Sequence, residues 1–352
     1  MTTKILFFGD MMLGNGYLSY NRGIRNYIRK NQKLPISKEI SDLIIRSDLS
    51  IVNLEAVISD ISEKKNITNQ IHRANPEVIK LLKENNINAF CFSNNHISEH
   101  GNEAFHSCYR LLLENNLHCF GIKKDNLSIL EINDIKYGFL NYSFIEDFLE
   151  DVPYCKITNS NYNLIFQDIK AALDRIDFLC LVFHWGEEYS PFPSEEQTNL
   201  AKKCIDFGAD LIVGHHAHVI QGFEKYKDKY IIYGLGNFIF DMTYIKNTRK
   251  SLIAEISINS KKETKLNLHL INVNPKNYFV SLVESFEISD NNNCPFSITK
   301  TTLNTKTKNK IKRRNIRQAQ NQIYSYFLRN IVRYPIKFTF YHIKKFINRR
   351  IS

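Results

Sequence analysis

Short apolar runs alternate with helix-like segments along the chain up to Val213. A bounded apolar run predicts a buried strand, and apolar residues at intervals of three and four predict an amphipathic helix. The predicted strands are Lys4–Gly9, Leu49–Asn53, Ile87–Phe92, Phe178–Phe183 and Leu211–Val213, and the predicted helices are Ser37–Arg46, Pro76–Glu84, Asn102–Asn115, Asn163–Arg175 and Ser194–Phe207. This alternation predicts an α/β fold with helices on the faces of a sheet.

From Tyr230 onward the pattern becomes rich in strands. A hairpin is predicted earlier, where two strand-like runs flank Asn133 and Asp134. The hairpin strands are Leu127–Ile132 and Lys136–Tyr142, and the later strands are Tyr230–Tyr233, Asn237–Phe240, Ser251–Ile258, Lys265–Val273 and Tyr278–Ile288. We therefore expect one large domain over residues 1–290, a linker over residues 291–310 that is rich in Asn, Thr and Lys, and a tail over residues 311–352.

Charge divides the chain into the same parts. The formal net charge is +11 over 352 residues, but the segment from Lys300 to Ser352 holds 15 basic and no acidic residues. Residues 1–299 therefore hold 32 basic and 36 acidic residues, a net charge of −4. The protein is predicted to be a slightly acidic body with a strongly basic tail, so arguments from charge about partners apply to the tail.

The start of the chain predicts a cytoplasmic protein. The apolar stretch Ile5–Phe8 is too short for a signal peptide and no small-residue cleavage site follows it. No apolar run approaches the roughly 20 residues of a membrane span. The seven cysteines form no Cys-x-x-Cys pair and most lie in apolar runs, which favours reduced, buried thiols.

Five predicted strands are each followed by polar residues of metal-binding type. Because ligands of open α/β sheets bind beyond the carboxyl ends of the strands, these residues are candidates for one pocket. They are Asp10, Asn53, Glu55, Asn94, Asn95, His96, His184, His215, His216 and His218. Carboxylate, amide and imidazole groups together suit Mn, Fe or Zn.

Each group taken alone has an ordinary structural explanation. Asp10 fits a helix N-cap, Asn94-Asn95-His96 fits turn chemistry, and His184 fits a hydrogen-bonded core histidine. The run Gly214–His218 is harder to explain in this way, because three histidines within four residues are costly to bury without a metal or carboxylates. The ordered set as a whole therefore favours a metal site.

The same motifs resemble the CapA family of capsule-synthesis proteins, which is named for poly-γ-glutamate capsule production and is similar to calcineurin-like metallophosphoesterases. The resemblance covers roughly residues 3–257. It is carried by Gly9–Gly14, Asn53–Glu55, His72–Pro76, Ser93–His96, His184–Tyr189, Gly214–Val219 and Leu235–Phe238.

The resemblance implies a four-layer α/β/β/α sandwich of the metallophosphoesterase type and a centre with two divalent metals. Asp10 would bind the first metal and Glu55 would bridge both. Asn95, His184 and His216 would bind the second, and His218 would return to the first. His96 would act beside them as the proton donor for the leaving group. Trp185 and Glu187–Tyr189 would line the cleft, and Asn53, Asn94, His215 and Asn237 are further candidates for the site.

Two positions depart from the family pattern. The first motif of phosphoesterases is usually Asp-x-His, and here the third position is Met12, whose thioether cannot replace imidazole for a hard cation. His215 is a candidate to compensate. A carboxylate that the family commonly supplies as Asp shortly after the motif histidine is here Glu99, which we assign to the catalytic group with His96. The first metal site is therefore the weaker part of the prediction.

The resemblance, together with these residues, implies a metal-dependent hydrolase that uses metal-activated water. Its substrate is predicted to be a phosphoester or another bond in a cell-envelope polymer or precursor of capsule biosynthesis. The main alternative is a non-catalytic scaffold in a membrane-associated polymer-synthesis complex, which Met12 favours. Another alternative is an amide hydrolase that acts on γ-glutamyl bonds.

The basic tail is predicted to be an amphipathic helix with interleaved aromatic residues. Apolar residues recur at helical spacing from Ile323 to Val332 and again from Phe338 to Ile347, with Pro335 between them and Lys or Arg throughout. Such a segment suits an anionic membrane surface, which places the protein at the inner face of the membrane. Packing of the tail against the body is the alternative, and nucleic acid is a less favoured partner.

Overall fold

Two β-sheets form the centre of the molecule. The computed structural model describes residues 2–20, 22–64, 69–147, 151–158, 161–289, 294–298, 303–340 and 343. The larger sheet has seven strands in the order β15-β14-β13-β1-β2-β5-β6. These strands are β1 (Thr2–Met11), β2 (Leu49–Leu54), β5 (Ala89–Cys91), β6 (His118–Phe120), β13 (Lys250–Asn259), β14 (Thr264–Val273) and β15 (Val280–Glu287).

The second sheet has six strands in the order β11-β12-β10-β9-β8-β7. Its strands are β7 (Ser128–Ile132), β8 (Ile135–Ser143), β9 (Phe178–His184), β10 (Leu211–His215), β11 (Ile220–Tyr226) and β12 (Lys229–Leu235). The predicted hairpin is confirmed as β7 and β8. Asn133 and Asp134 both have positive φ angles, of 52° and 64°, as a tight two-residue hairpin turn requires.

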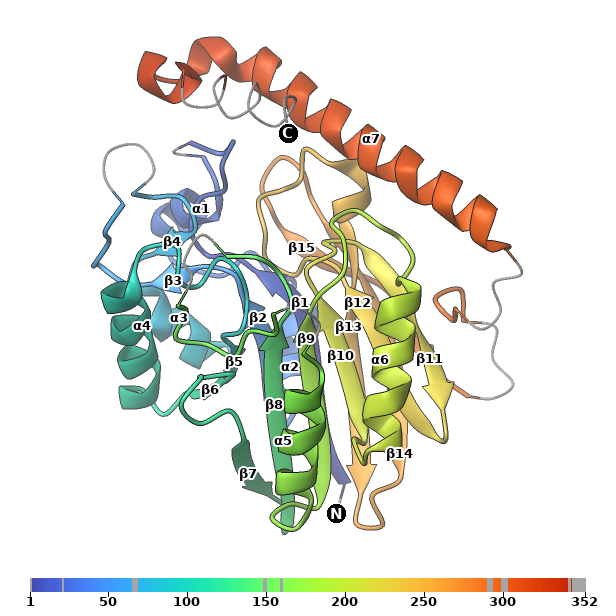
Figure 1. The fold of residues 1–352 in the computed structure, drawn as a ribbon. Coiled ribbons are helices and arrows are strands. Elements are labelled where there is room, and N and C mark those ends of the chain that lie inside the picture. The colour runs from blue at the N-terminus through green and yellow to red at the C-terminus, as the bar shows by residue number, and fades with distance from the viewer. Residues whose placement is uncertain are drawn as a thin grey trace.

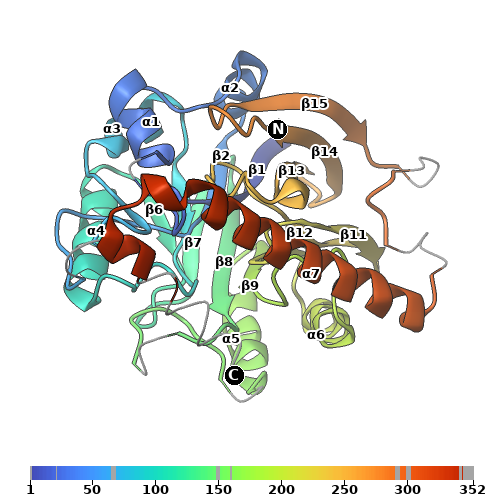
Figure 2. The same cartoon turned by 90° about the horizontal axis from the view of Figure 1, so that it is seen from above.

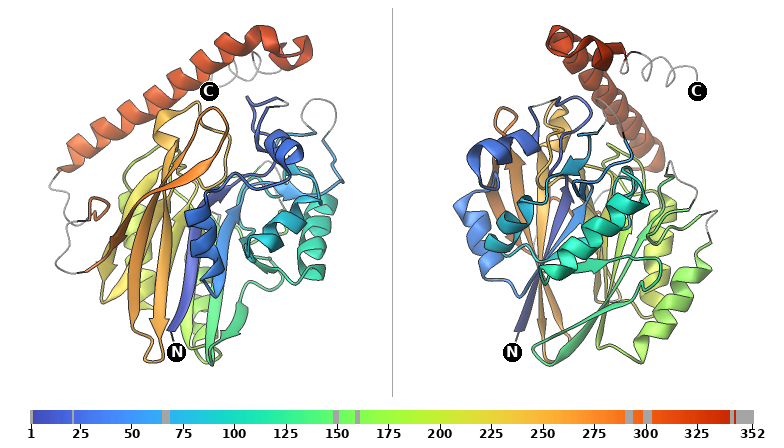
Figure 3. Two further views of the ribbon diagram at one scale, coloured as in Figure 1. Left: turned by 180° about the vertical axis from the view of Figure 1, so that it is seen from behind. Right: turned by 90° about the vertical axis from the view of Figure 1, so that its left-hand side faces the viewer.

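Helices cover the outer face of each sheet (Figures 1 and 3). One apolar core, which includes Phe8, Ile44 and Phe105, lies between the larger sheet and its helices. A second core fills the space between the sheets, and a third lies beneath the helices of the second sheet. The helices are α1 (Ile24–Asn31), α2 (Lys38–Ile45), α3 (Val78–Glu84), α4 (Asn102–Glu114), α5 (Asn163–Leu173) and α6 (Glu195–Asp206). The expected four-layer α/β/β/α sandwich is thereby confirmed.

Parallel pairing in both sheets brings the polar strand ends to one edge. In the larger sheet β1 runs parallel to β2 and Asp10 is opposite Asn53. In the other sheet β9 runs parallel to β10 and His184 is opposite His215. The carboxyl ends of strands from both sheets therefore meet where the candidate residues lie.

Local details differ from the sequence-based prediction. The predicted strand Asn237–Phe240 is wrong: Asn237 forms only an isolated bridge to Asp10, and the following residues form a loop. This loop is buried and apolar, which is why its pattern is that of a strand. Further elements without a counterpart among the predicted ones are α1, β6, β11 and the short pair β3 (Val57–Ile58) and β4 (Arg73–Ala74).

The basic tail forms a long helix, α7 (Thr305–Asn330), followed by the short 3₁₀ turn η3 (Ile331–Arg333). Seen from above, α7 crosses the top of the molecule over the carboxyl ends of the strands (Figure 2). It begins within the segment assigned to the linker, and residues 294–298 of that segment pair with β11 at Phe223. The predicted tail residues Tyr341, Lys344, Lys345, Phe346, Ile347, Arg349 and Arg350 lie outside the described residues. Within the described ranges, no helix has the length and apolar character that crossing a membrane requires.

Candidate metal centre

Two buried carboxylates lie at the ends of β1 and β2. The amide nitrogen of Asn53 donates to Asp10 Oδ1 at 2.8 Å and to Glu55 Oε1 at 3.1 Å. All three side chains are buried. Asn53 therefore holds the carboxylates in place through its donor groups, which makes it a positioning residue in this arrangement.

Imidazole groups approach these carboxylates from the second sheet. His184 Nδ1 lies 3.6 Å from Glu55 Oε1, and His184 Nε2 lies 3.0 Å from Asn95 Oδ1. His218 Nδ1 is 3.2 Å from Asp10 Oδ2, and its Nε2 is 3.9 Å from Glu55 Oε2. The ring of His216 packs beside that of His184 at a centroid distance of 4.8 Å. The six predicted metal ligands thus lie close together, and all of them except the half-buried Asn95 are buried.

A strained turn after β10 presents the histidines to the carboxylates. His216 and His218 have positive φ angles of 88° and 57°, which non-glycine residues rarely adopt. The backbone N–H of His216 donates to Asp10 Oδ2 at 3.3 Å. Asn237 Oδ1 lies 2.8 Å from His218 Nδ1, so this residue orients the ring. Strain of this kind is typical of functional sites.

The two buried carboxylates and the neighbouring imidazoles shift one another's pKa values. Burial and the charge of Asp10 raise the pKa of Glu55 well above its usual value. Burial also raises the pKa of Asp10, but hydrogen bonds from His215 and His218 outweigh it and hold that pKa well below its usual value. Burial lowers the pKa of His218, yet Glu55 and Asp10 raise it overall to about 10. A divalent cation supplies the charge that would keep both carboxylates ionised.

The donor set fits such a cation. One ligand atom from each of Asp10, Glu55 and His184 lies within 4.8 Å of the other two. Glu55 Oε2 is buried and has no hydrogen-bond partner among the described residues. A buried carboxylate oxygen without a donor is costly, and coordination of a metal would satisfy it. Two carboxylates and several imidazoles suit Mn, Fe or Zn.

The position of Met12 contributes no donor. Its side chain is buried in a small apolar cluster with Ala56 and Phe240, and the Phe240 ring packs edge-on to His218 at 5.2 Å. His215 lies closer to the carboxylates, with Nδ1 3.2 Å from Asp10 Oδ1. The structure thus fills the Met12 side of the cluster with apolar packing and presents an additional imidazole to Asp10.

A second polar cluster surrounds Glu99, next to the first. Glu99 Oε1 lies 2.5 Å from His96 Nδ1 and 3.2 Å from His72 Nδ1, and the Tyr17 hydroxyl donates to the same oxygen at 3.3 Å. The ammonium group of Lys64 pairs with Oε2. Burial raises the pKa of this carboxyl, but the charges of His72 and His96 and their hydrogen bonds hold it well below its usual value. Sequence analysis selected His96 and Glu99 but assigned no role to Tyr17, Lys64 or His72.

Asn94 has a structural role beside this cluster. Its Oδ1 accepts from the backbone N–H groups of His96 and Ile97, at 3.1 and 3.0 Å, and its amide donates to the Leu54 carbonyl at 2.8 Å. These bonds build the turn that places Asn95 and His96. Asn94 therefore forms a turn, as the structural explanation of this motif expected, and the same turn positions two residues of the candidate site.

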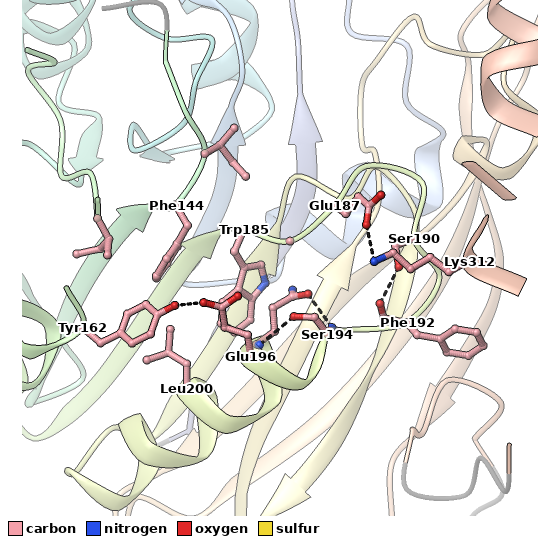
Figure 4. Close-up of a pocket in the computed structure, with 14 residues that line it drawn as sticks. Phe144, Tyr162, Trp185, Glu187, Ser190, Phe192, Ser194, Glu196, Leu200 and Lys312 are labelled. Carbon is pink, nitrogen blue, oxygen red and sulfur yellow. Dashed lines mark hydrogen bonds and ion pairs between the residues drawn. The ribbon is translucent and has the colours of Figure 1, made fainter. Parts of the chain in front are cut away.

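Trp185 and Glu187 lie in a neighbouring pocket of about 310 Å³ (Figure 4). The Trp185 indole donates to the Tyr233 carbonyl at 3.0 Å, and Glu187 is 52% exposed and pairs with Lys312 of α7. The carboxylate that approaches the histidines is Glu188. Burial raises its pKa, but the charges of His218 and His216 lower it overall. Within the predicted lining Glu187–Tyr189, Glu188 is thus the acidic residue close to the metal cluster.

Comparisons with known proteins show what this chain is similar to. The profile of the family PGA_cap, described as bacterial capsule synthesis protein, matches residues 4–242. The capsule biosynthesis protein CapA of Bacillus anthracis is 27% identical over 70% of this chain and 61% of its own length. The PGA biosynthesis protein CapA of Bacillus subtilis is 26% identical over 70% of this chain and 66% of its own length. The chain thus spans about two thirds of these relatives.

A solved structure of similar shape is the 5'-nucleotidase of Candida albicans. It has a TM-score of 0.45 and 12% sequence identity, and it covers 92% of this chain and 58% of its own. At that score the likeness adds nothing to what the two sheets show directly.

Proposed function

The chain belongs to the PGA_cap family of bacterial capsule synthesis proteins, and from that premise we propose that it is a metal-dependent hydrolase of capsule or cell-envelope polymer biosynthesis. Its proposed substrate is a phosphoester or a related bond of an envelope polymer or phosphorylated precursor. The observation that carries this proposal is the buried cluster of carboxylates and imidazoles, in which Glu55 Oε2 has no hydrogen-bond partner among the described residues.

The proposal assigns the metal ligands to the six residues that converge on this cluster. Asp10, Glu55 and His218 would hold one divalent cation, with His215 in reach of Asp10. Glu55, Asn95, His184 and His216 would hold the other. Bound divalent metals supply Lewis-acid chemistry, since they lower the pKa of water and neutralise charge on a phosphoryl group. Asn53 and Asn237 would fix the orientation of the ligands through hydrogen bonds.

The proton donor in this proposal is His96. Its Nδ1 is held by the Glu99 carboxylate, and its Nε2 lies 3.5 Å from the amide nitrogen of the proposed ligand Asn95, a contact that a protonated Nε2 would give up for the leaving group. Glu99 is buried and stays ionised because of its donors. The pair would therefore hold a proton at His96 Nε2, at the edge of the metal cluster.

A panel of phosphomonoester, phosphodiester and γ-glutamyl amide substrates tests the proposal with protein loaded with Mn²⁺. We expect turnover of a phosphoester that is abolished by the variant His216→Ala. The matched control is His106→Ala, which changes an exposed histidine of α4 and should keep activity. Turnover of the amide alone would move the reaction class to amide hydrolysis.

The scaffold alternative is supported by one observation, the apolar packing of Met12 at a position where a ligand would be expected. Elemental analysis of the reconstituted protein separates the two functions. Two metals per chain, falling in Asp10→Asn, support the hydrolase. Absence of bound metal in the wild type would contradict the hydrolase and favour the scaffold.

A further inference from the structure

The helix α7 is fixed to the body along one face. Ala319 is buried in a small apolar cluster with Tyr189 and Ile245, and the ring of Tyr326 stacks on Tyr244 at 4.8 Å. The backbone N–H of Lys246 donates to Gln322 Oε1 at 2.6 Å. The expectation of a tail that packs on the body is met over this stretch, so α7 is held in a defined orientation above the strand ends (Figure 2).

Aromatic anchors extend this attachment beyond Pro335. The ring of Phe338 is 1% exposed and packs against Tyr20 and Tyr334, at centroid distances of 5.0 and 4.8 Å. Tyr334 stacks on Phe327 at 5.8 Å, and its hydroxyl donates to the Leu18 carbonyl at 2.8 Å. These contacts of the buried side chains with the body therefore fix which side chains at this end of the chain face solvent.

Large apolar side chains are exposed at this end. Leu328, Val332, Ile336 and Phe340 are 51%, 89%, 72% and 66% exposed, and they are spaced four residues apart. Four large apolar side chains, exposed at regular spacing and close together in sequence, form the kind of patch that marks an interaction site. We call these four residues the apolar stripe.

Cations surround the apolar stripe and continue along the exposed side of α7. Residues 303–340 hold ten Lys or Arg and no acidic residue. Arg329, Arg333 and Lys337, which alternate with the stripe, are all exposed. Further along the helix the exposed cations are Lys306, Lys310, Arg313, Arg314 and Arg317. The partner of this surface must be anionic and must also accept apolar side chains.

We propose that this surface docks on a lipid bilayer that contains anionic phospholipid. The apolar stripe would enter the boundary between headgroups and acyl chains, and the cations would contact the headgroups. A soluble anionic polymer or a nucleic acid would use the cations but offers no apolar phase for the stripe. Docking would bring the edge of the sheets that carries the metal cluster toward the membrane.

Vesicle sedimentation of the full chain tests this inference without reference to enzymatic activity. The probes are phosphatidylcholine vesicles with and without phosphatidylserine. We expect binding only to the anionic vesicles. The variant Val332→Ser/Ile336→Ser/Phe340→Ser should bind at least tenfold more weakly, and Arg329→Gln/Arg333→Gln/Lys337→Gln about 100-fold more weakly, at about fivefold per cation.

Two matched controls change similar residues on the body. Val283→Ser removes an exposed apolar side chain of β15, and Lys30→Gln/Lys80→Gln/Lys83→Gln removes three exposed cations. Both should bind vesicles as the wild type does, and thermal melts should show all variants folded. Unchanged binding by the apolar-stripe variant would overturn the inference. So would a soluble polyanion, such as polyphosphate, that binds as tightly as the vesicles and is insensitive to the loss of the stripe.

Discussion

Replacement of Glu99 by Gln tests the second polar cluster in both stability and activity. The carboxylate is buried and is bound by Lys64, Tyr17, His72 and His96. Removing one partner of a buried charge network typically costs about 3 kcal/mol or more, because the other charges lose their counterion. For a chain of 352 residues the loss corresponds to a fall in Tm of about 4 °C, because the entropy of unfolding is roughly 2 cal/mol/K per residue. Glu103→Gln, at an exposed position at the start of α4, is the matched control and should leave Tm unchanged.

The stability that Glu99→Gln loses should depend on pH, in a direction that follows from the pKa of Glu99. Because the pKa of Glu99 is lowered in the folded protein, its ionised form contributes stability above the ordinary glutamate pKa of 4.5. That contribution is lost as the pH falls through the lowered pKa. Thermal melts should therefore separate the wild type from Glu99→Gln near neutral pH, and the difference should shrink in acid. A difference that persists unchanged in acid would refute the assignment of charge to Glu99.

The same variant separates positioning from chemistry. If Glu99 acts by orienting His96, Glu99→Gln should lower kcat by about 100-fold, and the double variant with His96→Ala should be no slower than His96→Ala alone. Activity is measured on the phosphoester that the wild type turns over. Additive losses in the double variant, or an unchanged kcat in Glu99→Gln, would show that the network serves stability alone.

Three further changes have definite expected outcomes. Mn²⁺ at about 100 times its Kd should stabilise the wild type by about 2.7 kcal/mol in a thermal melt, and a shift of equal size in Asp10→Asn would argue against the assigned ligand. Met12→His should raise the metal content per chain in elemental analysis, because Met12 packs with Phe240 beside His218. An unchanged metal content would show that the new imidazole cannot reach the cluster. Burial raises the pKa of Asp241 to about 6, so its protonated form contributes stability that is lost as the pH rises from about 4 through 6. Urea unfolding of Asp241→Asn should therefore show a smaller fall in stability between pH 4 and pH 8 than the wild type shows, because an amide does not titrate and its oxygen still accepts from the Gly16 N–H.

Hydrophobic periodicity predicts most of this fold because the strands are buried on both faces. Runs such as Phe178–Phe183 are continuous and apolar, since this strand lies between the inter-sheet core and α5 and α6. The same rule fails at Asn237–Phe240, where an apolar loop is buried without forming a ladder. It also does not indicate α1, whose sequence Ile24–Asn31 is mostly polar with a narrow apolar face. Hydrophobic periodicity indicates which residues are buried, but burial alone does not show that a segment pairs with other strands.

The candidate site could be predicted as a set because its members follow strand ends, and parallel strands bring those ends together. The separate roles of these residues could not be predicted from the sequence. Asn53 and Asn94 have the same residue type as Asn95, yet Asn53 donates to the carboxylates and Asn94 builds a turn. Only the geometry of the donors distinguishes these roles. The other partners of Glu99, apart from His96, are Tyr17, Lys64 and His72, which come from segments more than 20 residues away in sequence, so spacing carries no signal for them.

The choice between Glu187 and Glu188 shows where sequence reasoning stops for physical reasons. After β9 the chain passes through Gly186 and Tyr189, both with positive φ angles, of 84° and 64°. Each such residue turns the backbone out of the extended path, so the alternation that places His184 and Trp185 on opposite faces ends there. Glu187 consequently reaches Lys312 on α7, while Glu188 approaches His216 and His218. Glu187 lies within residues 4–242, which the family profile matches, and it is paired with α7, which lies outside that matched segment. The cleft next to the metal cluster is therefore built jointly by the family fold and by the basic helix of this chain, and loss of α7 should alter the pocket as well as the proposed membrane surface.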